Sequence, residues 1–296
     1  MLIPQSIRFI SRHPLNRGRK LKALARFAAW QIGSRLVPGP VVFEWVRGAK
    51  FLVRAGERGL TGNVHTGLHE FREMAFLLHL LRADDLFVDV GANAGSYTIL
   101  ASAAVGARGY AFEPGPDAYR RLTDNVRLNR IEDRVTCLEM CLGAEPGTVL
   151  LTEDLDSGNH ALAPGEPGAR TVTAAVSTLD AVLDGERPAL VKIDVEGYEA
   201  AVLEGARRTL DERTLLAAII ELNGSGERYG FDESRVVATM VGHGFTACSY
   251  DPFTRSLASL PGRDPASDNT LFVRDVPLVA ERLTTAEKIT VHGRQF

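Results

Sequence analysis

Residues 87–98 read Phe87-Val88-Asp89-Val90-Gly91-Ala92-Asn93-Ala94-Gly95-Ser96-Tyr97-Thr98, and no other stretch of the 296-residue chain is as informative about its architecture. An apolar strand carries an acid near its end, a Gly-x-Asn-x-Gly turn follows, and small residues then begin a helix. Glycines allow the backbone to approach a ligand closely, and the free amides at the start of a helix attract an anion such as a carboxylate. The stretch therefore predicts a strand–turn–helix unit that binds a ligand at the edge of a parallel sheet.

The chemistry of this turn distinguishes between two ligands that contain a nucleoside. The methionine end of S-adenosylmethionine offers a carboxylate to the helix amides and an amino group to Asp89. A dinucleotide motif, Gly-x-Gly-x-x-Gly, needs glycines where Asn93 and Ser96 stand, and a pyrophosphate gains nothing from Asp89. The turn favours S-adenosylmethionine over NAD, and the remaining alternative is a tight turn without a ligand.

A second acid follows at the distance that a nucleoside site requires. Glu113 lies in Phe112-Glu113-Pro114, at the end of the next expected strand and about twenty residues after the glycine turn, where an acid accepts hydrogen bonds from ribose hydroxyls. Cys141, just after the third strand, is then expected near the adenine, with a simple core cysteine as the alternative.

The pattern of apolar segments predicts the fold. Short buried strands alternate with helices, which is typical of a mainly parallel sheet covered on both faces. We expect strands at 86–90, 109–112, 134–140, 190–194, 216–222, 245–250 and 270–274, and helices near 70–82, 95–104, 116–129, 198–210 and 232–242. Residues 143–176 interrupt this order as a surface excursion with short strands near 148–152 and 171–176. The prediction is a doubly wound α/β fold with a seven-stranded sheet and a ligand beyond the carboxyl ends of the strands.

Acids gather where the fourth and fifth strands end. Asp194 and Glu196 follow one strand, and Glu221 and Asn223 end the next. One interpretation is a general base that takes the proton from an acceptor hydroxyl, with Asp194 or Glu196 in that role and His160 as another candidate. Two alternatives remain: an ion pair with Lys192 together with helix capping, or a divalent cation held by Asp194, Glu221 and Asn223.

Together these motifs resemble the FkbM family of methyltransferases. The shared elements are Asp-Val-Gly-Ala-Asn-x-Gly, Glu-Pro, Lys-Ile-Asp-Val-Glu-Gly-x-Glu and Ile-Ile-Glu, and the resemblance covers about residues 65–275. It implies a class I, Rossmann-like methyltransferase that modifies a hydroxyl of a sugar, glycan or natural product. It also implies a catalytic or substrate role near Asp194 and Glu196. The cofactor contacts expected in and beside these motifs are Asp89, Gly91, Ala92, Asn93, Gly95, Ser96, Thr98, Glu113 and Pro114, with Cys141 after the third strand. Glu70 matches a glutamate upstream of the family's first strand and is expected to close over the cofactor.

The segments outside this pattern suggest three regions. They are a basic helical arm with a β-hairpin (1–60), the methyltransferase domain (61–276) and a polar, peripheral tail (277–296). The arm has eight basic residues and no acid between Arg8 and Arg35. Its apolar residues recur at helical spacing: Leu21, Leu24, Ala25, Ala28 and Ile32. Such a stripe usually faces a core, but a basic amphipathic helix also suits an anionic membrane surface and a lipid-linked glycan acceptor.

Composition narrows the function classes. The formal net charge of −3 gives no reason to expect nucleic acid as a partner, and three cysteines without a Cys-x-x-Cys pattern suggest a reducing compartment. No apolar run reaches the length of a membrane span, and the start lacks the apolar core of a secretory signal, so we expect a cytoplasmic protein. No motif specifies an oligomeric state. The competing functions are N-methyl transfer, a silent cofactor-binding protein and an NAD-dependent oxidoreductase, which Asn93 and Ser96 disfavour.

Overall fold

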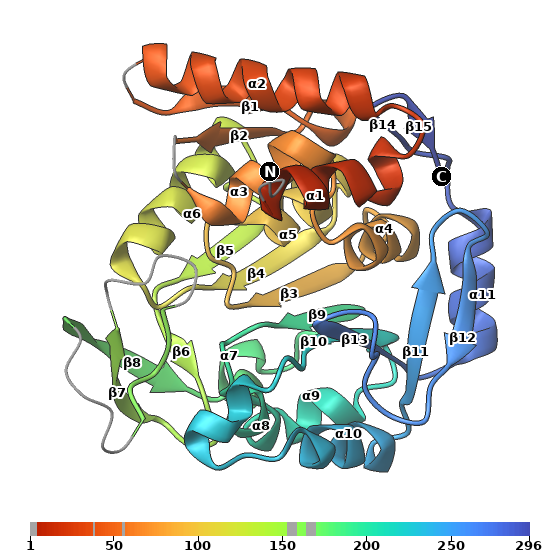
Figure 1. The fold of residues 1–296 in the computed structure, drawn as a ribbon. Coiled ribbons are helices and arrows are strands. Elements are labelled where there is room, and N and C mark those ends of the chain that lie inside the picture. Colours follow the sequence, from red (N-terminus) through yellow and green to blue (C-terminus); the bar gives the residue numbers. More distant parts are fainter. Residues whose placement is uncertain (1–4, 38, 55–56, 153–158, 164–169) are drawn as a thin grey trace.

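An eight-stranded sheet forms the centre of the structure, a computed structural model that describes residues 5–37, 39–54, 57–152, 159–163 and 170–296 (Figure 1). The strands lie in the order β12 (Ser256–Ser259), β11 (Thr246–Asp251), β13 (Asn269–Val273), β10 (Ala217–Glu221), β9 (Leu190–Ile193), β3 (Leu86–Val90), β4 (Arg108–Phe112) and β5 (Val135–Leu138). Neighbours from β10 to β5 are parallel. The pairs that involve β13, β11 and β12 are antiparallel. The predicted doubly wound, mainly parallel α/β fold is confirmed.

Strand β3 sits at the point where the winding of the sheet reverses. The chain proceeds from β3 to β4 and β5 on one side, and β9 and β10 lie on the other. Successive side chains of a strand point to opposite faces, and accordingly Phe87 belongs to one hydrophobic core whereas Val88 and Val90 belong to the second. Both faces are buried, as parallel sheets require, and the crevice at the carboxyl ends of β3 and β9 is left for a ligand.

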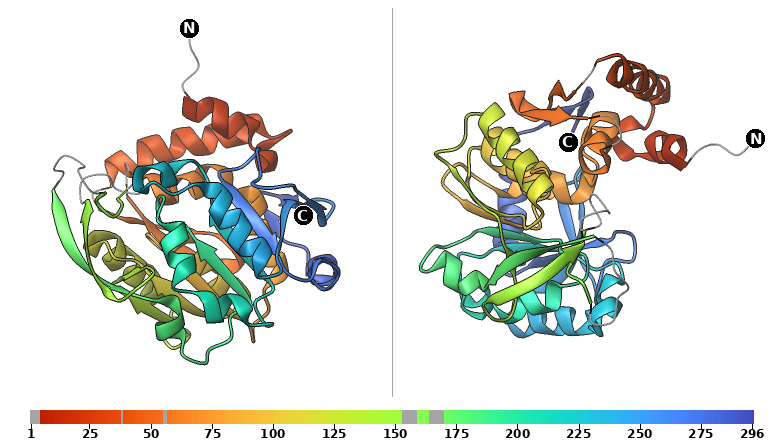
Figure 2. Two further views of the ribbon diagram at one scale, coloured as in Figure 1. Left: turned by 90° about the horizontal axis from the view of Figure 1, so that it is seen from below. Right: turned by 90° about the vertical axis from the view of Figure 1, so that its left-hand side faces the viewer.

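Helices cover the two faces of the sheet (Figures 1 and 2). The upper face in Figure 1 carries α3 (Arg58–Thr66), α4 (Phe71–Leu80), α5 (Ser96–Ile99) with its π-helical continuation (Leu100–Val105), and α6 (Pro116–Leu128). The lower face carries α7 (Leu179–Leu183), α8 (Glu199–Glu204), α9 (Arg207–Asp211) and α10 (Glu233–Gly242). The crevice therefore opens between two helical layers.

Several boundaries differ from the sequence-based expectation. The sheet has eight strands rather than seven, because turn-rich residues after β11 return as β12 and pair with it. The expected helix at 198–210 is split into α8 and α9 at Gly205. A side chain there would meet the carbonyl oxygen of Gly143 at 2.1 Å, so only glycine permits this approach of two backbones.

The surface excursion forms a small sheet of its own. Strands β6 (Cys141–Leu142), β8 (Thr171–Ser177) and β7 (Gly147–Thr152) pair in that order, so both predicted strands are present. The turn-rich segments 153–158 and 164–169 within the excursion lie outside the described residues.

The two ends of the chain pack on the central domain. The described residues between Gln5 and Val53 form α1 (Gln5–Arg12), a 3-10 turn (Pro14–Asn16), α2 (Lys20–Leu36) and the predicted hairpin of β1 (Val41–Glu44) and β2 (Lys50–Val53), which encloses a second 3-10 turn (Val46–Gly48). Leu15 and Phe51 are fully buried in the same core as Phe87.

The last residues form α11 (Val276–Thr285), β14 (Thr290–Val291) and β15 (Arg294–Gln295). The expectation of a peripheral tail is wrong, because Leu283 and Phe296 also belong to this core. None of the helices described is both long enough and apolar enough to cross a bilayer.

Candidate active site

A cavity of about 320 Å³ lies beyond the carboxyl ends of β3, β4, β9 and β10. The small sheet borders it through Val149 and Leu151 of β7. The expected site residues that line it are Glu70, Asp89, Gly91, Ala92, Asn93, Ser96, Glu113, Pro114, Cys141, His160, Asp194 and Glu196. The chain thus brings together residues from both halves of the doubly wound fold, and the volume is in the range of about 300–1,000 Å³ that small-molecule sites occupy.

Thr98 and Gly95 do not line the cavity, although both were expected to contact a cofactor. Thr98 is buried behind it, where its amide and its hydroxyl donate hydrogen bonds to Oδ2 of Asp89 at 3.0 and 2.6 Å. Gly95 begins α5 with φ of 90°, and a side chain there would meet Leu122 at 2.8 Å. Both residues therefore stabilise the turn between β3 and α5 without lining the cavity.

Asp89 is held in place by these contacts and lines the cavity. Burial raises the pKa of its carboxyl to about 6, despite the hydrogen bonds from Thr98 and the charge of Lys192, which act in the opposite direction. A cationic ligand group beside Asp89 would compensate for the burial of its charge.

Gly91 is required where β3 leaves the sheet. Its φ is +82°, and a side chain would lie 1.8 Å from the carbonyl oxygen of Asp194. The first glycine of the turn therefore allows the ends of β3 and β9 to come together. Asn93, with φ of 49°, is one of the few described non-glycine residues in the left-handed region, and its Oδ1 accepts a hydrogen bond from the amide of Ala94. Such strained residues concentrate at functional sites.

Glu113 ties the second strand to the glycine turn. Its Oε2 accepts a hydrogen bond from the amide of Asn93 at 2.8 Å, and its Oε1 accepts one from the amide of Gly115 at 2.8 Å. Burial raises the pKa of Glu113 to about 7. Each carboxylate oxygen can accept a second hydrogen bond, so the residue keeps capacity for a pair of ligand hydroxyls.

Glu70 lies immediately before α4 and is held from two sides. Its Oε2 accepts a hydrogen bond from the hydroxyl of Tyr97 at 2.7 Å, and its Oε1 accepts one from Nδ2 of Asn269 at 2.8 Å. Tyr97 also lines the cavity, and its ring lies 4.7 Å from Nζ of Lys192. Tyr97 and Asn269 were not recognised from the sequence, where neither has a charge or motif that would distinguish it from a core residue.

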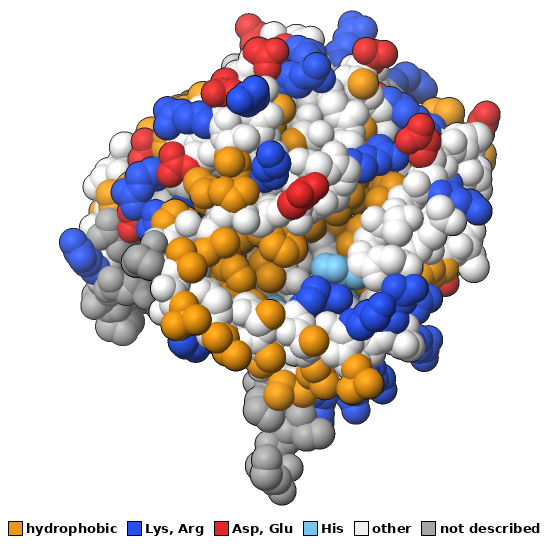
Figure 3. Space-filling view, turned by 90° about the horizontal axis from the view of Figure 1, so that it is seen from above, with side chains coloured by type: hydrophobic (Ala, Val, Ile, Leu, Met, Phe, Trp, Pro, Cys, Tyr) orange, Lys and Arg blue, Asp and Glu red, His pale blue; other side chains and the backbone are white. Residues whose placement is uncertain are grey.

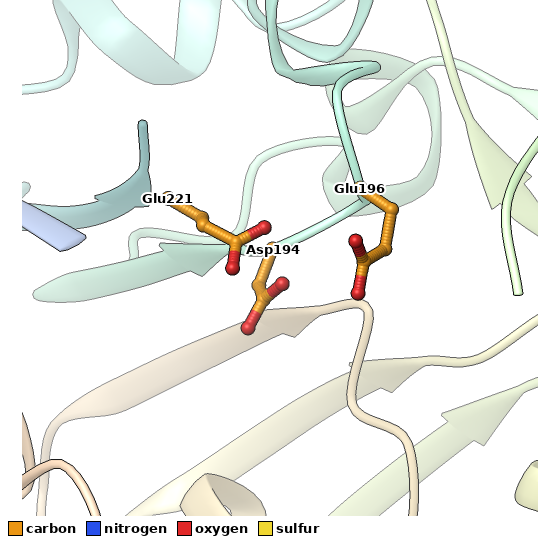
Figure 4. A group of neighbouring side chains, drawn as sticks. All are labelled: Asp194, Glu196 and Glu221. Carbon is orange, nitrogen blue, oxygen red and sulfur yellow. The ribbon is translucent and has the colours of Figure 1, made fainter. Parts of the chain in front are cut away.

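Three carboxylates meet at the rim: Asp194 and Glu196 after β9, and Glu221 at the end of β10 (Figure 4). One oxygen of each lies within 4.8 Å of the others. Nζ of Lys192, on the buried strand β9, lies 2.6 Å from Oδ2 of Asp194. The ion pair considered as an alternative at the sequence level is therefore present. The Lys192–Asp194 pair does not explain why the carboxylates of Glu196 and Glu221 also lie there.

The crowding of these acids changes their protonation. Burial, followed by the charges of Asp194 and Glu196, raises the pKa of Glu221 to about 10. Burial and the charge of Asp194 also raise the pKa of Glu196. Burial opposes the charge of Lys192, yet the neighbouring Asp194 raises the lysine pKa well above its usual value. Near neutral pH, Glu221 is therefore protonated and Lys192 is charged.

The expectation that Asn223 supplies the third ligand of a cation site is wrong. Asn223 is exposed, and its Oδ1 accepts a hydrogen bond from the amide of Ser225 instead of facing the cavity. Glu196 takes the third place beside Asp194 and Glu221. The carboxylate oxygens of these residues are of the type that binds hard cations, but the ammonium of Lys192 already supplies a positive charge there.

The turn after β9 fixes the direction of Glu196. Glu196 has φ of 56° and Gly197 has φ of 105°, so the chain reverses within two residues. Oε1 of Glu199 accepts hydrogen bonds from the amides of Val195 and Gly197, each at 3.1 Å. The last acid of the Asp-Val-Glu-Gly-x-Glu motif therefore holds the turn, and the strained Glu196 points its carboxylate toward the cavity.

His160 and Cys141 complete the wall on the side of the small sheet. His160 is buried, its amide donates a hydrogen bond to Oγ1 of Thr152 at 3.0 Å, and it interacts electrostatically with Glu196. Burial raises the pKa of the Cys141 thiol to about 12, so this cysteine is a neutral apolar contact rather than a nucleophile. The apolar remainder of the wall includes Met74, Met140, Leu142 and Tyr198.

Acids near the ends of the first two strands of a doubly wound sheet are characteristic of proteins that bind a nucleoside, because they reach the ribose and the groups beside it. This chain has that fold, and Asp89 and Glu113 stand at these two places. Residues 89–250, more than half of the chain, match the family described as the Methyltransferase FkbM domain. The chain belongs to this family of methyltransferases.

Two characterised relatives and one solved structure are similar to this chain. This chain is 30% identical over 200 residues to the hexuronic acid methyltransferase AglP of Haloferax volcanii. The aligned region covers 64% of this chain and 78% of AglP. It is also 30% identical over 169 residues to the methyltransferase sdnD of Sordaria araneosa, and that aligned region covers 46% of this chain and 65% of sdnD. The crystal structure of methyltransferase FkbM from Methylobacillus flagellatus superposes with a TM-score of 0.46 at 19% identity, over 72% of this chain and 52% of that chain.

Proposed function

We propose that this protein transfers a methyl group from S-adenosylmethionine to a hydroxyl of a sugar, glycan or natural product. The observation that carries the proposal is the joining of two groups of acids in one cavity. Asp89 and Glu113 form one group, and Asp194, Glu196 and Glu221 form the other. The first suits a nucleoside cofactor with an amino-acid end, and the second suits proton removal from an acceptor.

The residues on the nucleoside side fit this cofactor. Glu113 retains acceptor capacity for the two ribose hydroxyls, and Asp89 is a buried carboxylate suited to a cationic amino group. Apolar side chains around Cys141 suit an adenine ring. When bound, S-adenosylmethionine supplies a methyl group that is activated by its positive sulfur.

Asp194 is the residue we assign as general base. It lies at the rim, its side chain is 28% exposed, and Lys192 fixes the orientation of its carboxylate through Oδ2. An alcohol is a poor nucleophile until a base accepts its proton during attack. Protonated Glu221 adds no negative charge of its own, so it can stay close to Asp194 without repelling it.

The electrostatics of the rim favour a hydroxyl over a carboxylate acceptor. Three acids share one lysine there, and Asp194 and Glu196 would repel an anionic acceptor group. A carboxylate also has no proton to lose, so it would not need a base. The printed activity of AglP concerns hexuronic acid, a sugar that has both kinds of group. Within such an acceptor, we expect the hydroxyl to receive the methyl group.

The test is transfer of a labelled methyl group from S-adenosylmethionine to a panel of neutral sugars, hexuronic acids and glycans. We expect label in an alkali-stable ether, whereas a methyl ester would be released by mild alkali. Calorimetry with S-adenosylhomocysteine and NAD provides the control for the cofactor. Binding of NAD without binding of S-adenosylhomocysteine would contradict the whole proposal, and label on an amine would favour N-methyl transfer.

A further inference from the structure

The outer face of α2 exposes apolar side chains that nothing in the described chain covers. The stripe expected from the sequence faces solvent: Leu21 is 84% exposed and Ile32 is 62% exposed, and Ala25 and Ala28 are also exposed. Leu36, 76% exposed, extends the same line. Only Leu24 of the expected stripe is half-buried. The usual interpretation, a stripe that faces the core, is therefore wrong for this helix.

The opposite face of α2 already has a partner. Ala23 is fully buried, the ring of Phe27 contacts that of His65 at 5.0 Å, and Trp30 packs on the core. Arg26 donates a hydrogen bond to Oδ1 of Asn16 at 2.7 Å. The orientation of the helix is thus fixed by its inner side, and the outer stripe remains exposed without disturbing the fold.

Neighbouring elements also expose apolar side chains. Val42 on β1 is 52% exposed and Phe9 on α1 is 42% exposed. Figure 3 shows hydrophobic side chains across this face, with Lys and Arg among and around them. Exposed patches of this kind mark interaction sites in otherwise well-packed proteins.

The charged residues of α1 and α2 are all basic, although Asp and Glu side chains also lie on this face of the molecule (Figure 3). The first acid of the chain is Glu44, and the exposed basic residues before it are Arg8, Arg12, Arg17, Arg19, Lys20, Lys22 and Arg35. Lys20 and Lys22 flank Leu21, so cations lie on both sides of the stripe. We call the surface formed by Phe9, Leu21, Ile32, Leu36, Val42 and these cations the basic–apolar face.

We propose that the basic–apolar face docks on an anionic lipid bilayer. An interfacial helix places its apolar side chains at the boundary of headgroups and acyl chains while its basic residues meet anionic headgroups. A second copy of this chain is a poorer partner, because a symmetric contact would bring two basic rims together. A nucleic acid would pair with the cations but leave Leu21, Ile32 and Leu36 unsatisfied.

The same region contacts the wall of the cavity. The ring of Phe9 lies 5.1 Å from that of His69, and Nε2 of His13 lies 3.3 Å from the carbonyl oxygen of His69, a residue that lines the cavity. Docking would therefore involve a segment that contacts the wall of the cavity. This contact also shows that α1 is fixed against the domain.

The experiment is co-sedimentation of the full-length protein with vesicles of phosphatidylcholine alone or mixed with phosphatidylglycerol, without cofactor or acceptor. We expect binding only to the mixed vesicles, and weaker binding as salt is raised. The triple variant Leu21→Glu/Ile32→Glu/Leu36→Glu should lose binding. The control Val241→Glu/Leu278→Glu changes exposed apolar residues elsewhere and should bind like the wild type.

A second, milder variant guards against a folding defect. Lys20→Gln/Lys22→Gln should weaken vesicle affinity about fivefold for each charge removed, with unchanged thermal unfolding. Failure of the wild type to bind mixed vesicles at low salt would overturn the proposal. A wild-type dimer that the triple variant converts to a monomer, without vesicle binding by either, would instead assign this face to contact between copies. Neither result depends on methyl transfer, so the proposed function is tested separately.

Discussion

Nζ of Lys192 lies 2.6 Å from Oδ2 of Asp194, although the lysine side chain is only 3% exposed. This pair connects the buried interior of β9 with the open rim of the cavity. Asp194 is the one acid of the rim whose side chain forms a salt bridge among the described residues, and its carboxylate lies beside those of Glu196 and Glu221 (Figure 4). The arrangement suits a base that must hold one orientation while an acceptor hydroxyl approaches.

Asp194→Asn tests the assignment of the base. The variant keeps the shape of the side chain and removes its basicity, so turnover should fall by about 10²–10⁴-fold. Because we propose that Asp194 acts on the acceptor rather than on the cofactor, the dissociation constant for S-adenosylhomocysteine should remain nearly unchanged. Asp133→Asn, on an exposed turn, is the control. Full activity of the Asp194→Asn variant would show that Asp194 is not the base. Glu196, tested by Glu196→Gln, and His160 would then be the remaining candidates.

Lys192→Met should destabilise the protein. Removing the ammonium leaves the acids of the rim without their buried cation, and breaking such a pair typically costs about 3–5 kcal/mol. The double variant Lys192→Met/Asp194→Asn should recover part of this loss, since both partners are then neutral. The free energy of unfolding in urea measures both effects.

A matched control for the lysine is Arg120→Met, which removes the exposed Arg120–Asp117 pair and should change stability by less than about 1 kcal/mol. Equal losses for the buried and the exposed pair would contradict a special role for Lys192. No recovery in the double variant would show that Lys192 stabilises the fold by packing rather than by charge.

The fold was accessible from the sequence because its signals are local. Each parallel strand is a short apolar run buried on both faces, and the Gly91–Gly95 turn marks where the ligand edge lies. Strand β12 was missed because three of its four residues are exposed and the fourth is only partly buried, so it lacks the apolar run that identifies a strand. The burial of Phe296 was missed for a related reason, since a single aromatic residue after a polar tail gives no periodicity.

The site was accessible only where its residues follow strands. Asp89, Glu113 and Asp194 were found because strand ends meet at one edge. Tyr97 and Asn269 come together with Glu70 through tertiary packing between segments that are 27 and 199 residues apart from it, and no local pattern reports that proximity. The exposure of the stripe on α2 was equally hidden, because periodicity identifies an apolar face but not what covers it.

Gly91→Ala should both destabilise the protein and impair cofactor binding. The backbone conformation alone should cost about 1–3 kcal/mol in a residue with a side chain, and the added carbon would displace the carbonyl of Asp194. Gly242→Ala in α10 is the control, because its φ is not positive and a side chain there would meet nothing within 4 Å. Thermal unfolding and calorimetry should separate the two variants. A fully stable Gly91→Ala protein would mean that the ends of β3 and β9 can move apart.

The raised pKa of Glu113 leads to a prediction of how cofactor affinity depends on pH. Burial raises the pKa of this carboxyl to about 7, so the cofactor-free fold holds the proton more tightly than the unfolded chain does. The buried carboxylate of Glu113 therefore lowers the stability of the cofactor-free protein. This penalty is absent below a pH of about 4.5, the ordinary pKa, and complete above a pH of about 7. Ribose hydroxyls donate to the ionised form, and binding should therefore favour the carboxylate and release a proton. Below pH 7, affinity should weaken by up to about tenfold per pH unit.

Calorimetry with S-adenosylhomocysteine at pH 6, 7 and 8 measures this dependence. Glu113→Gln should weaken binding by about 1–3 kcal/mol, the cost of a poorly satisfied buried partner, and should flatten the change between pH 7 and 8. Some dependence should persist at lower pH, because burial raises the pKa of Asp89 to about 6 and the proposed contact with the amino group needs its ionised form. Glu139→Gln, an exposed acid just before the small sheet, should behave like the wild type. Equal affinity of the wild type at pH 6 and 8 would contradict this prediction, because it would show that cofactor binding does not change the ionisation of Glu113 or Asp89 in this range.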